Sequence, residues 1–361
     1  MKIVNILFNY KKSTNENKIL GVERCFIDYA KHLTLSGNKV LSITKPKMVY
    51  ASEARQASTR FAEIKAVNNA DISSMIRMAI LFLSFSPDVI ICHSGRALFL
   101  ARAARFLLCK KIPIIAIDHG INPKKFLKAD YVLTVNSFFC GELIKAGKAP
   151  ETSLVIPNMI EVPKDFTPLV KQPFRKPIRL GSLGRIYVEK NFDKILRAMV
   201  ILRERGIESE YVIGGIGPEE KSLKELAKEL KLKKEFQILG WTNNKRDFFD
   251  SIDIFILPSA YETFGIVLLE AMLYSTPILT SNSWGPDEVI TDGVDGLKVS
   301  KDSDEAMPEL LANAIERMIN NEEFAKGLAV KASEKFFANY SAEKVREKLN
   351  GIIEMVVAKK N

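Results

Sequence analysis

The chain has 361 residues, of which 47% are hydrophobic and 27% charged, and its formal net charge is +10. This length exceeds what one ordinary hydrophobic core supports and predicts a globular protein of two domains. The longest apolar run, residues 78–85, is far shorter than the ~20 residues of a membrane-spanning helix, which argues against an integral membrane protein. The four cysteines are scattered without a CxxC pair, so we expect reduced thiols in the cytoplasm and neither a disulfide framework nor a zinc site.

The excess positive charge belongs entirely to the first half of the chain. Residues 1–164 hold 24 Lys/Arg and 12 Asp/Glu, whereas residues 165–361 hold 29 and 31. The first half is therefore the part expected to meet an anionic surface, such as the inner face of the cytoplasmic membrane. We expect no nucleic-acid partner.

Short apolar runs alternate with helix-length segments through the first part of the chain. Strands are expected at residues 2–8, 39–43, 88–92, 112–117, 131–135 and 154–156, and helices at 22–36, 73–85, 97–109 and 138–146. This alternation predicts a parallel sheet covered by helices on both faces. Residues 50–60 show no clear period and are expected to form a mobile excursion.

Four prolines between residues 163 and 177 interrupt this pattern and predict an interdomain linker. The alternation then restarts, with strands expected at 178–183, 210–213, 236–239, 252–257 and 278–280 and helices at 192–203, 219–230, 247–251 and 265–274. The expected fold class is α/β, with two doubly wound parallel-sheet domains at residues 1–168 and 177–340. Ligands of such sheets bind beyond the carboxyl ends of the strands. Apolar residues at helical spacing predict a last helix within residues 341–361.

Two carboxylates eight positions apart, Glu262 and Glu270, bracket the join between an apolar strand and an apolar helix. The amides of Gly265, Ile266 and Val267 open that helix and lack intrahelical partners, so they can stabilise an anion. Each carboxylate can accept two hydrogen bonds from the paired hydroxyls of a sugar. The pattern predicts a site for a sugar nucleotide. The alternative is that Glu270 caps a surface and Glu262 is solvated.

A glycine-punctuated strand end at residues 181–184 is followed by Arg185 and Lys190 before the next helix. Arg can bind two phosphate oxygens at once and Lys adds a point charge, so together they could neutralise a diphosphate. The alternative is that both are ordinary surface cations. Gly215 lies in a second glycine turn, a weak signal by itself because glycines often relieve crowding in such turns.

Residues 259–271 resemble the E-x7-E motif of retaining GT-B glycosyltransferases of family 4, also called glycosyl transferases group 1. The segment with Arg185 and Lys190 is similar to the G-R-x-x-x-x-K-N segment of that family, and residues 214–218 resemble its G-x-G-P element. The resemblance implies the GT-B fold, in which two Rossmann-like domains face a cleft. It also implies that the helix at 341–361 crosses back to pack on the first domain.

The resemblance further implies roles for single residues. It assigns donor binding to a set in the second domain: Gly184, Arg185, Lys190, Gly215, Glu262, Phe264, Gly265, Ile266, Val267 and Glu270. In the first domain it places Gly21 at the acceptor and His119 near both the donor sugar and the acceptor, although His119 could equally be structural. The candidate catalytic residues are therefore His119, Arg185, Lys190 and Glu262.

A metal site finds little support in the sequence. Asp302 and Asp304 form the one D-x-D sequence, and they precede a helical run, so helix capping explains them better than a metal does. We expect neither a metal nor a cofactor.

The sequence thus predicts a retaining, metal-independent hexosyltransferase that uses a nucleoside diphosphate sugar, with a UDP-sugar favoured. The expected acceptor is a glycan or a lipid-linked glycan, in lipopolysaccharide or cell-surface polysaccharide biosynthesis. The expected location is the cytoplasm, with peripheral attachment to the inner face of the cytoplasmic membrane as an option. Two alternatives remain: a sugar-nucleotide epimerase on the same fold, and a nucleotide-sugar-binding subunit that has lost transfer activity.

Overall fold

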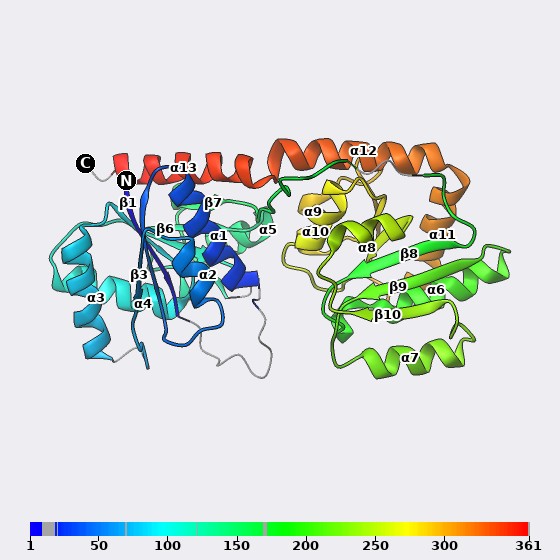
Figure 1. Cartoon of the computed structure of the whole chain (residues 1–361), viewed down its shortest axis with the longest axis horizontal. Coiled ribbons are helices and arrows are strands. Elements are labelled where there is room, and N and C mark those ends of the chain that lie inside the picture. Colours follow the sequence, from blue (N-terminus) through cyan, green and yellow to red (C-terminus); the bar gives the residue numbers. More distant parts are fainter. Residues whose placement is uncertain (9–18, 20, 69–70, 121, 169–171, 360–361) are drawn as a thin grey trace. The chain divides into compact units, whose positions relative to one another are not determined.

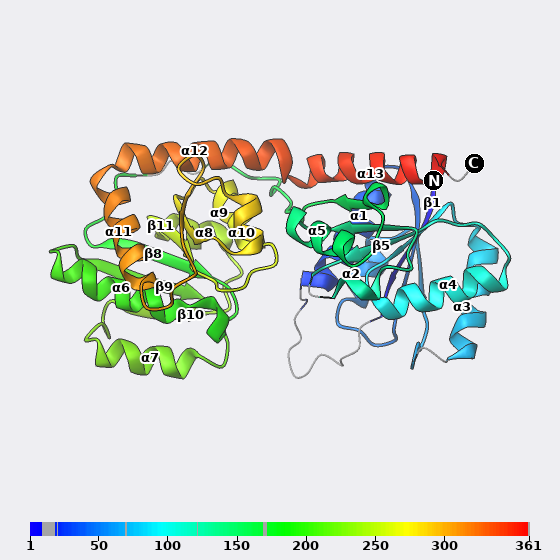
Figure 2. The ribbon, with the colours of Figure 1, turned by 180° about the vertical axis from the view of Figure 1, so that it is seen from behind.

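The computed structural model describes residues 1–8, 19, 21–68, 71–120, 122–168 and 172–359. The chain divides into two compact units, one made of Met1–Asn158 with Val345–Asn361 and the other of Met159–Lys344. Each unit is a parallel sheet with helices against its faces (Figures 1 and 2). The predicted α/β class with two doubly wound sheets is confirmed.

The first unit contains a seven-stranded sheet in the order β3-β2-β1-β4-β5-β6-β7. Its strands are β1 (Lys2–Leu7), β2 (Lys39–Thr44), β3 (Arg60–Glu63), β4 (Val89–Cys92), β5 (Ile114–Asp118), β6 (Tyr131–Thr134) and β7 (Ser153–Val155). Its helices are α1 (Gly21–Leu35), α2 (Ala51–Gln56), α3 (Ile72–Phe85), α4 (Gly95–Leu107), α5 (Ser137–Lys145) and most of α13 (Ala342–Ala358).

Side chains of β1 alternate between the two faces of this sheet, as strand geometry requires. Ile6 belongs to the hydrophobic cluster formed with α3 and α4, whereas Leu7 packs with Phe26 of α1 and Ala54 of α2. Both strand residues are fully buried. Because both faces are covered, β1 is apolar apart from Lys2 and the buried Asn5.

The second unit contains a six-stranded sheet in the order β10-β9-β8-β11-β12-β13. Its strands are β8 (Ile178–Leu183), β9 (Ser209–Gly214), β10 (Phe236–Gly240), β11 (Ile254–Leu257), β12 (Ile278–Ser281) and β13 (Leu297–Val299). Its helices are α6 (Phe192–Glu204), α7 (Glu220–Glu229), α8 (Lys245–Ser251), α9 (Ile266–Leu273), α10 (Trp284–Val289), α11 (Met307–Asn320) and α12 (Glu322–Asn339).

The strand order reverses once in each sheet, between β1 and β4 in the first unit and between β8 and β11 in the second. At such a point the two chain segments leave neighbouring strands in opposite directions and open a crevice beyond their carboxyl ends. These two places are where a ligand is expected.

The expectation of a mobile excursion at residues 50–60 is wrong. Residues 51–56 form α2, and β3 begins at Arg60 and pairs with β2 at the edge of the sheet. Other elements cover an edge strand only in part, so none of the four residues of β3 is fully buried. The sequence of β3 therefore lacks the apolar run by which a buried strand is recognised.

The first unit ends at Asn158, whereas the sequence placed the boundary between residues 168 and 177. Ile160 pairs with Ser341 in a parallel bridge, and its carbonyl accepts a hydrogen bond from Ala342 N at 3.0 Å, which ties this segment to the second unit. Beyond it, Asn350 of α13 donates to Ser36 Oγ at 2.7 Å within the first unit. Among the described residues, no helix is long and apolar enough to cross a bilayer.

Candidate functional site

Two loops border the crevice expected where the second sheet reverses its strand order, residues 184–191 after β8 and residues 258–265 after β11. They are joined by hydrogen bonds from Ala260 N to Glu189 O at 2.9 Å and from Asn191 Nδ2 to Pro258 O at 3.0 Å. The two loops therefore form one continuous structure beyond the carboxyl ends of the central strands.

Lys190 and Glu262, predicted separately from the two loops, are in direct contact. Lys190 Nζ lies 2.5 Å from Glu262 Oε2, and the two side chains are only 14% and 15% exposed. A partly buried pair of this kind is weakly screened by water. The structure thus brings together the cation assigned to a diphosphate and the carboxylate assigned to a sugar.

Arg185 presents its charge differently. It is exposed, and its guanidinium lies 5.1 Å from the centre of the Tyr187 ring. In the part of the chain that the structure describes, Arg185 has no ion-pair partner. Its donors can therefore bind an anion without the loss of an existing ion pair.

The two glycine turns approach each other closely. Gly184 N donates to Gly214 O at 3.0 Å, and a Cβ atom on Gly215 would lie 1.8 Å from Gly184 O. Packing of one loop against the other therefore requires glycine at position 215. The assignment of Gly184 and Gly215 to donor binding stays a prediction.

Helix α9 begins at Ile266, one residue later than predicted, with Gly265 as its N-cap. Gly265 has φ +83°, a left-handed conformation that glycine adopts without strain. The amides of Ile266 and Val267 lie in the first turn and have no acceptor within the helix. Phe264 is 2% exposed and packs toward Tyr340, so its side chain belongs to the core and only its backbone can meet a ligand.

Glu270 lies on α9 with its side chain 18% exposed. Lys245 Nζ is 3.3 Å from Glu270 Oε2 but outside hydrogen-bond geometry, so this oxygen has no hydrogen-bond partner among the described residues. Burial raises the pKa of Glu270, and the charge of Lys245 opposes that rise. An unsatisfied buried carboxylate oxygen is a natural acceptor for ligand hydroxyls. No motif pointed to Lys245, which is the first residue of a separate helix, α8.

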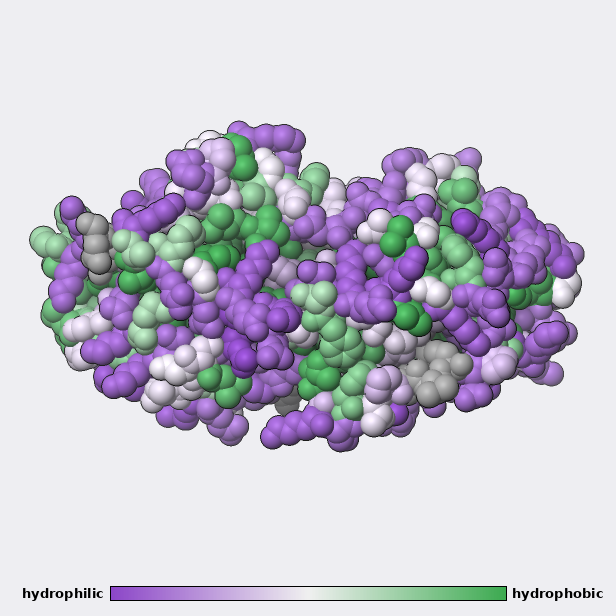
Figure 3. Space-filling view, turned by 90° about the horizontal axis from the view of Figure 1, so that it is seen from above, coloured by the Kyte–Doolittle hydropathy of each residue, from purple (hydrophilic) through white to green (hydrophobic). Residues whose placement is uncertain are grey.

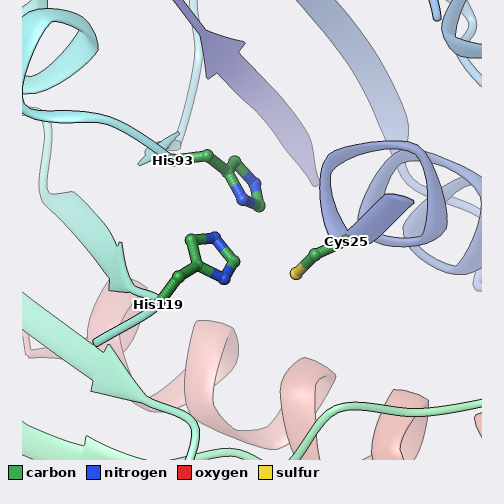
Figure 4. Close-up of side chains that lie close together, drawn as sticks. All are labelled: Cys25, His93 and His119. Atoms are coloured by element: carbon green, nitrogen blue, oxygen red, sulfur yellow. The ribbon is translucent and has the colours of Figure 1, made fainter. Parts of the chain in front are cut away.

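Gly21 and His119 belong to the first unit, apart from the other predicted residues. Gly21 is the exposed first residue of α1. His119 directly follows β5, and His93 directly follows the neighbouring β4. The two imidazole rings stack with centroids 5.8 Å apart, and Cys25 of α1 lies beside them (Figure 4).

Burial controls the ionisation of these side chains. It lowers the pKa of His119 to about 4, and burial with the nearby His119 lowers the pKa of His93 well below its ordinary value. Both rings are therefore neutral at pH 7. Burial raises the pKa of the adjacent Asp118, although Gly120 N donates to its Oδ1 at 2.9 Å.

The expected capping role of Asp302 and Asp304 is wrong. Helix α11 starts at Met307, its N-cap Ala306 has no side chain that caps the helix, and Ser303 Oγ accepts a hydrogen bond from Ala306 N at 3.2 Å. Asp304 instead pairs with Lys194 Nζ at 2.5 Å, and Asp302 accepts from Ser300 Oγ at 2.7 Å. An ion pair with α6 and a hydrogen bond within the loop therefore account for these two carboxylates.

Residues 166–335 match the family model described as Glycosyl transferases group 1. The lipopolysaccharide core biosynthesis glycosyltransferase LpsD of Rhizobium meliloti is 24% identical over 94% of this chain and 96% of its own length. The amylovoran biosynthesis glycosyltransferase AmsK of Erwinia amylovora is 24% identical over 63% of this chain and 61% of its own.

Solved structures show the same fold. A glycosyltransferase from Rickettsia africae superposes with a TM-score of 0.81 at 19% identity and covers 99% of this chain and 98% of its own. Anabaena Alr3699/HepE, solved in complex with UDP and glucose, gives a TM-score of 0.75 at 17% identity over 98% of this chain and 100% of its own. The GT-B fold is thus confirmed, the family model confirms the resemblance to group 1 over residues 166–335, and the relatives support a glycosyltransferase.

Proposed function

We propose that this GT-B glycosyltransferase moves a hexose from a nucleoside diphosphate sugar to a glycan or lipid-linked acceptor, with retention at the anomeric carbon. The observation that carries the proposal is the arrangement at the β8–β11 crevice. There the exposed Arg185, the Lys190–Glu262 pair and the first amides of α9 all follow adjacent strands. These groups supply positive charge for a diphosphate and a carboxylate for sugar hydroxyls within one structure.

The crevice suits departure of a diphosphate. Negative charge grows on the leaving group as the glycosidic bond breaks, and fixed cations and amides stabilise that charge in the transition state. Arg185 can bind the diphosphate at once, whereas Lys190 must share its ammonium with Glu262. A diphosphate that draws Lys190 away would leave the Glu262 carboxylate to accept hydroxyls of the transferred sugar.

Glu270 would hold the ribose. Its unsatisfied Oε2 lies on α9, in the same unit as the crevice, and Lys245 keeps a positive charge 3.3 Å away. Two neighbouring hydroxyls of a ribose can donate to one carboxylate. We favour a UDP-sugar because HepE, which shares the fold, was solved with UDP and glucose.

The acceptor would be lipid-linked and reached at an anionic membrane surface. Helix α3 exposes four apolar side chains at helical spacing, and α4 exposes three more. We call these seven side chains the α3–α4 apolar surface: Ile72, Ile76, Ile80, Leu83, Phe99, Phe106 and Leu107. At the end of the first unit where α3 lies, at the left in Figure 3, apolar side chains lie on the surface among hydrophilic ones. The exposed Lys110 and Lys111 follow α4, so apolar and cationic groups lie close along the chain.

A panel of UDP-, GDP- and ADP-sugars in thermal unfolding tests the donor, because a ligand that binds only the folded protein raises the midpoint. Transfer assays with the donor that raises it, followed by assignment of the product anomer, test retention. Activity in excess EDTA tests metal independence: we expect transfer to continue, because Arg185 and Lys190 supply the cationic charge. Loss of activity that Mg²⁺ or Mn²⁺ restores would overturn that part. Epimerisation of the donor without acceptor, or binding without turnover, would identify one of the two alternatives.

A further inference from the structure

Three side chains with metal-binding atoms meet in the first unit, outside the diphosphate crevice. One ring nitrogen each of His93 and His119 and the sulfur of Cys25 all lie within 4.8 Å of one another (Figure 4). The sheet order explains this meeting, since His93 and His119 follow the adjacent strands β4 and β5, and α1 follows β1, which neighbours β4. Two imidazoles and a thiolate are a ligand set that zinc prefers.

The protonation of His93 is fixed by Asn5. Asn5 Nδ2 donates to the Phe26 carbonyl at 2.9 Å, so Asn5 Oδ1 is the atom that lies 2.8 Å from His93 Nε2. An amide oxygen only accepts, so Nε2 must carry the proton, and Nδ1 of the neutral ring holds a lone pair. A hydrogen bond of this kind commonly orients a metal-binding histidine.

Two nitrogens of the cluster are buried without a partner. His93 is 2% exposed, and neither its Nδ1 nor His119 Nε2 has a hydrogen-bond partner in the described ranges of the chain. Buried polar atoms are rarely left unsatisfied in folded proteins, so such atoms point to a missing ligand. The Phe26 and Tyr29 rings meet His93 edge-on at 5.6 and 5.2 Å and hold its plane.

We propose that Cys25 Sγ, His93 Nδ1 and His119 Nε2 bind one divalent transition-metal ion of the zinc class. On binding, the thiol proton passes to solvent, one metal–sulfur bond and two metal–nitrogen bonds form, and a water completes the tetrahedron. No oxidant or reductant takes part. If the proposed transferase function holds, a metal on His119 withdraws this ring from the substrates, so zinc inhibits transfer and EDTA protects it.

Cobalt is the probe for this site, because tetrahedral Co²⁺ absorbs in the visible and a thiolate ligand adds a near-ultraviolet charge-transfer band. The reduced, metal-free full chain is titrated with Co²⁺ and then with Zn²⁺. We expect one Co²⁺ per chain, both absorption features, and displacement by Zn²⁺. Cys109→Ser, at an exposed thiol, is the matched control and should behave as the wild type.

Cys25→Ser should abolish the charge-transfer band, and His119→Ala should weaken Co²⁺ binding by at least ~10-fold. The two variants are independent, so a folding failure in one leaves the other decisive. A wild type without the band, or a band that survives Cys25→Ser, would overturn the site. The spectra need no substrate, so an inactive protein with the expected spectra would refute the transferase proposal and leave the metal site in place.

Discussion

Lys190 Nζ lies 2.5 Å from Glu262 Oε2, and this contact joins two residues that are 72 positions apart in the chain. The loops that carry them leave the adjacent strands β8 and β11. Without a ligand, each residue neutralises the other. The ion pair joins the two loops, and a diphosphate that bound there as we propose would compete with the Glu262 carboxylate for Lys190.

Substitutions of Lys190 and Glu262 should have non-additive effects on the free energy of unfolding. We expect Lys190→Ala and Glu262→Ala each to lower the free energy of unfolding, because each leaves a partly buried charge unpaired. The double variant should be less destabilised than the sum of the two, by roughly 0.5–3 kcal/mol. Denaturant unfolding of all four proteins measures this coupling. The exposed Lys221–Glu225 pair on α7, 3.8 Å apart, is the control and should show at most about 0.5 kcal/mol.

Removal of the Arg185 charge should affect activity far more than stability. Arg185 is exposed and has no ion pair among the described residues, so Arg185→Ala leaves no buried charge unpaired. We expect transfer to fall by ~100-fold or more through lost stabilisation of the leaving diphosphate, by analogy with the removal of an oxyanion-hole donor. Lys190→Ala should lower transfer comparably but also destabilise the fold. Steady-state kinetics with thermal unfolding separates the two effects.

Lys221→Ala is the control for this pair of variants, because Lys221 is an exposed cation of the same unit, with its side chain 89% exposed. It should leave kcat/KM unchanged. Near-normal turnover in folded Arg185→Ala and Lys190→Ala would contradict the assignment of the crevice to a diphosphate.

Glu270 should favour ligand binding at a cost to stability. Burial raises the pKa of Glu270 in the folded protein above the ordinary value of 4.5, so the folded state disfavours the ionised form. Well below pH 4.5 the group is protonated in both the folded and the unfolded protein and contributes no pH dependence. As pH rises from there through the folded pKa, the wild type loses stability that a neutral Gln would keep. Glu270→Gln should therefore gain stability relative to the wild type as pH rises, and bind donor about tenfold more weakly.

Unfolding of both proteins at a series of pH values, with donor titrations at pH 7, checks this. Glu225→Gln removes an exposed charge and serves as the control, with no comparable trend. A stability difference that stays constant from pH 4 to pH 8 would show that Glu270 is not strained by burial.

The sequence predicted the features that are local in the chain. The apolar runs identified β8 and β11. The loops after these strands carry Arg185 and Glu262, and both loops lie at the carboxyl edge of the sheet because parallel strands share that edge. Helix α12 had no counterpart among the expected elements. Its buried residues include Ala325, Ala329 and Ala332, and such small side chains give only a faint hydrophobic period.

What the sequence could not show is which side chains meet across elements. The Lys245–Glu270 contact and the cluster of Cys25 with His93 and His119 depend on strand order and helix packing, not on spacing. We expected no zinc site because the four cysteines form no CxxC pair. That criterion detects only ligands that are close in the sequence. The same limit applies to the α3–α4 apolar surface. In the sequence, the apolar residues of α3 cannot be told from core residues, and only the structure shows that some of them are exposed.

The α3–α4 apolar surface and the charge next to it should bind anionic membranes. Residues 1–164 carry 24 Lys/Arg against 12 Asp/Glu, and each Lys or Arg near an anionic leaflet contributes ~1 kcal/mol of attraction. We expect the protein to sediment with phosphatidylserine-containing vesicles but not with purely zwitterionic ones, and the bound fraction to fall as salt screens the charge. The alternative to membrane binding is that α4 is a core helix whose cations are solvated.

Two variants separate the contributions of charge and apolar contact. The double variant Lys110→Glu with Lys111→Glu should weaken binding by at least ~10-fold, since two favourable charges become unfavourable. The control is Lys233→Glu with Lys234→Glu, which makes the same charge change at exposed lysines of the second unit. Phe106→Ser removes the most exposed side chain of the surface, 82% exposed, and should weaken binding even at high salt, where apolar insertion dominates. Equal, salt-independent binding to both vesicle types, or equal losses in both lysine pairs, would leave the surface without a membrane role and favour a soluble acceptor.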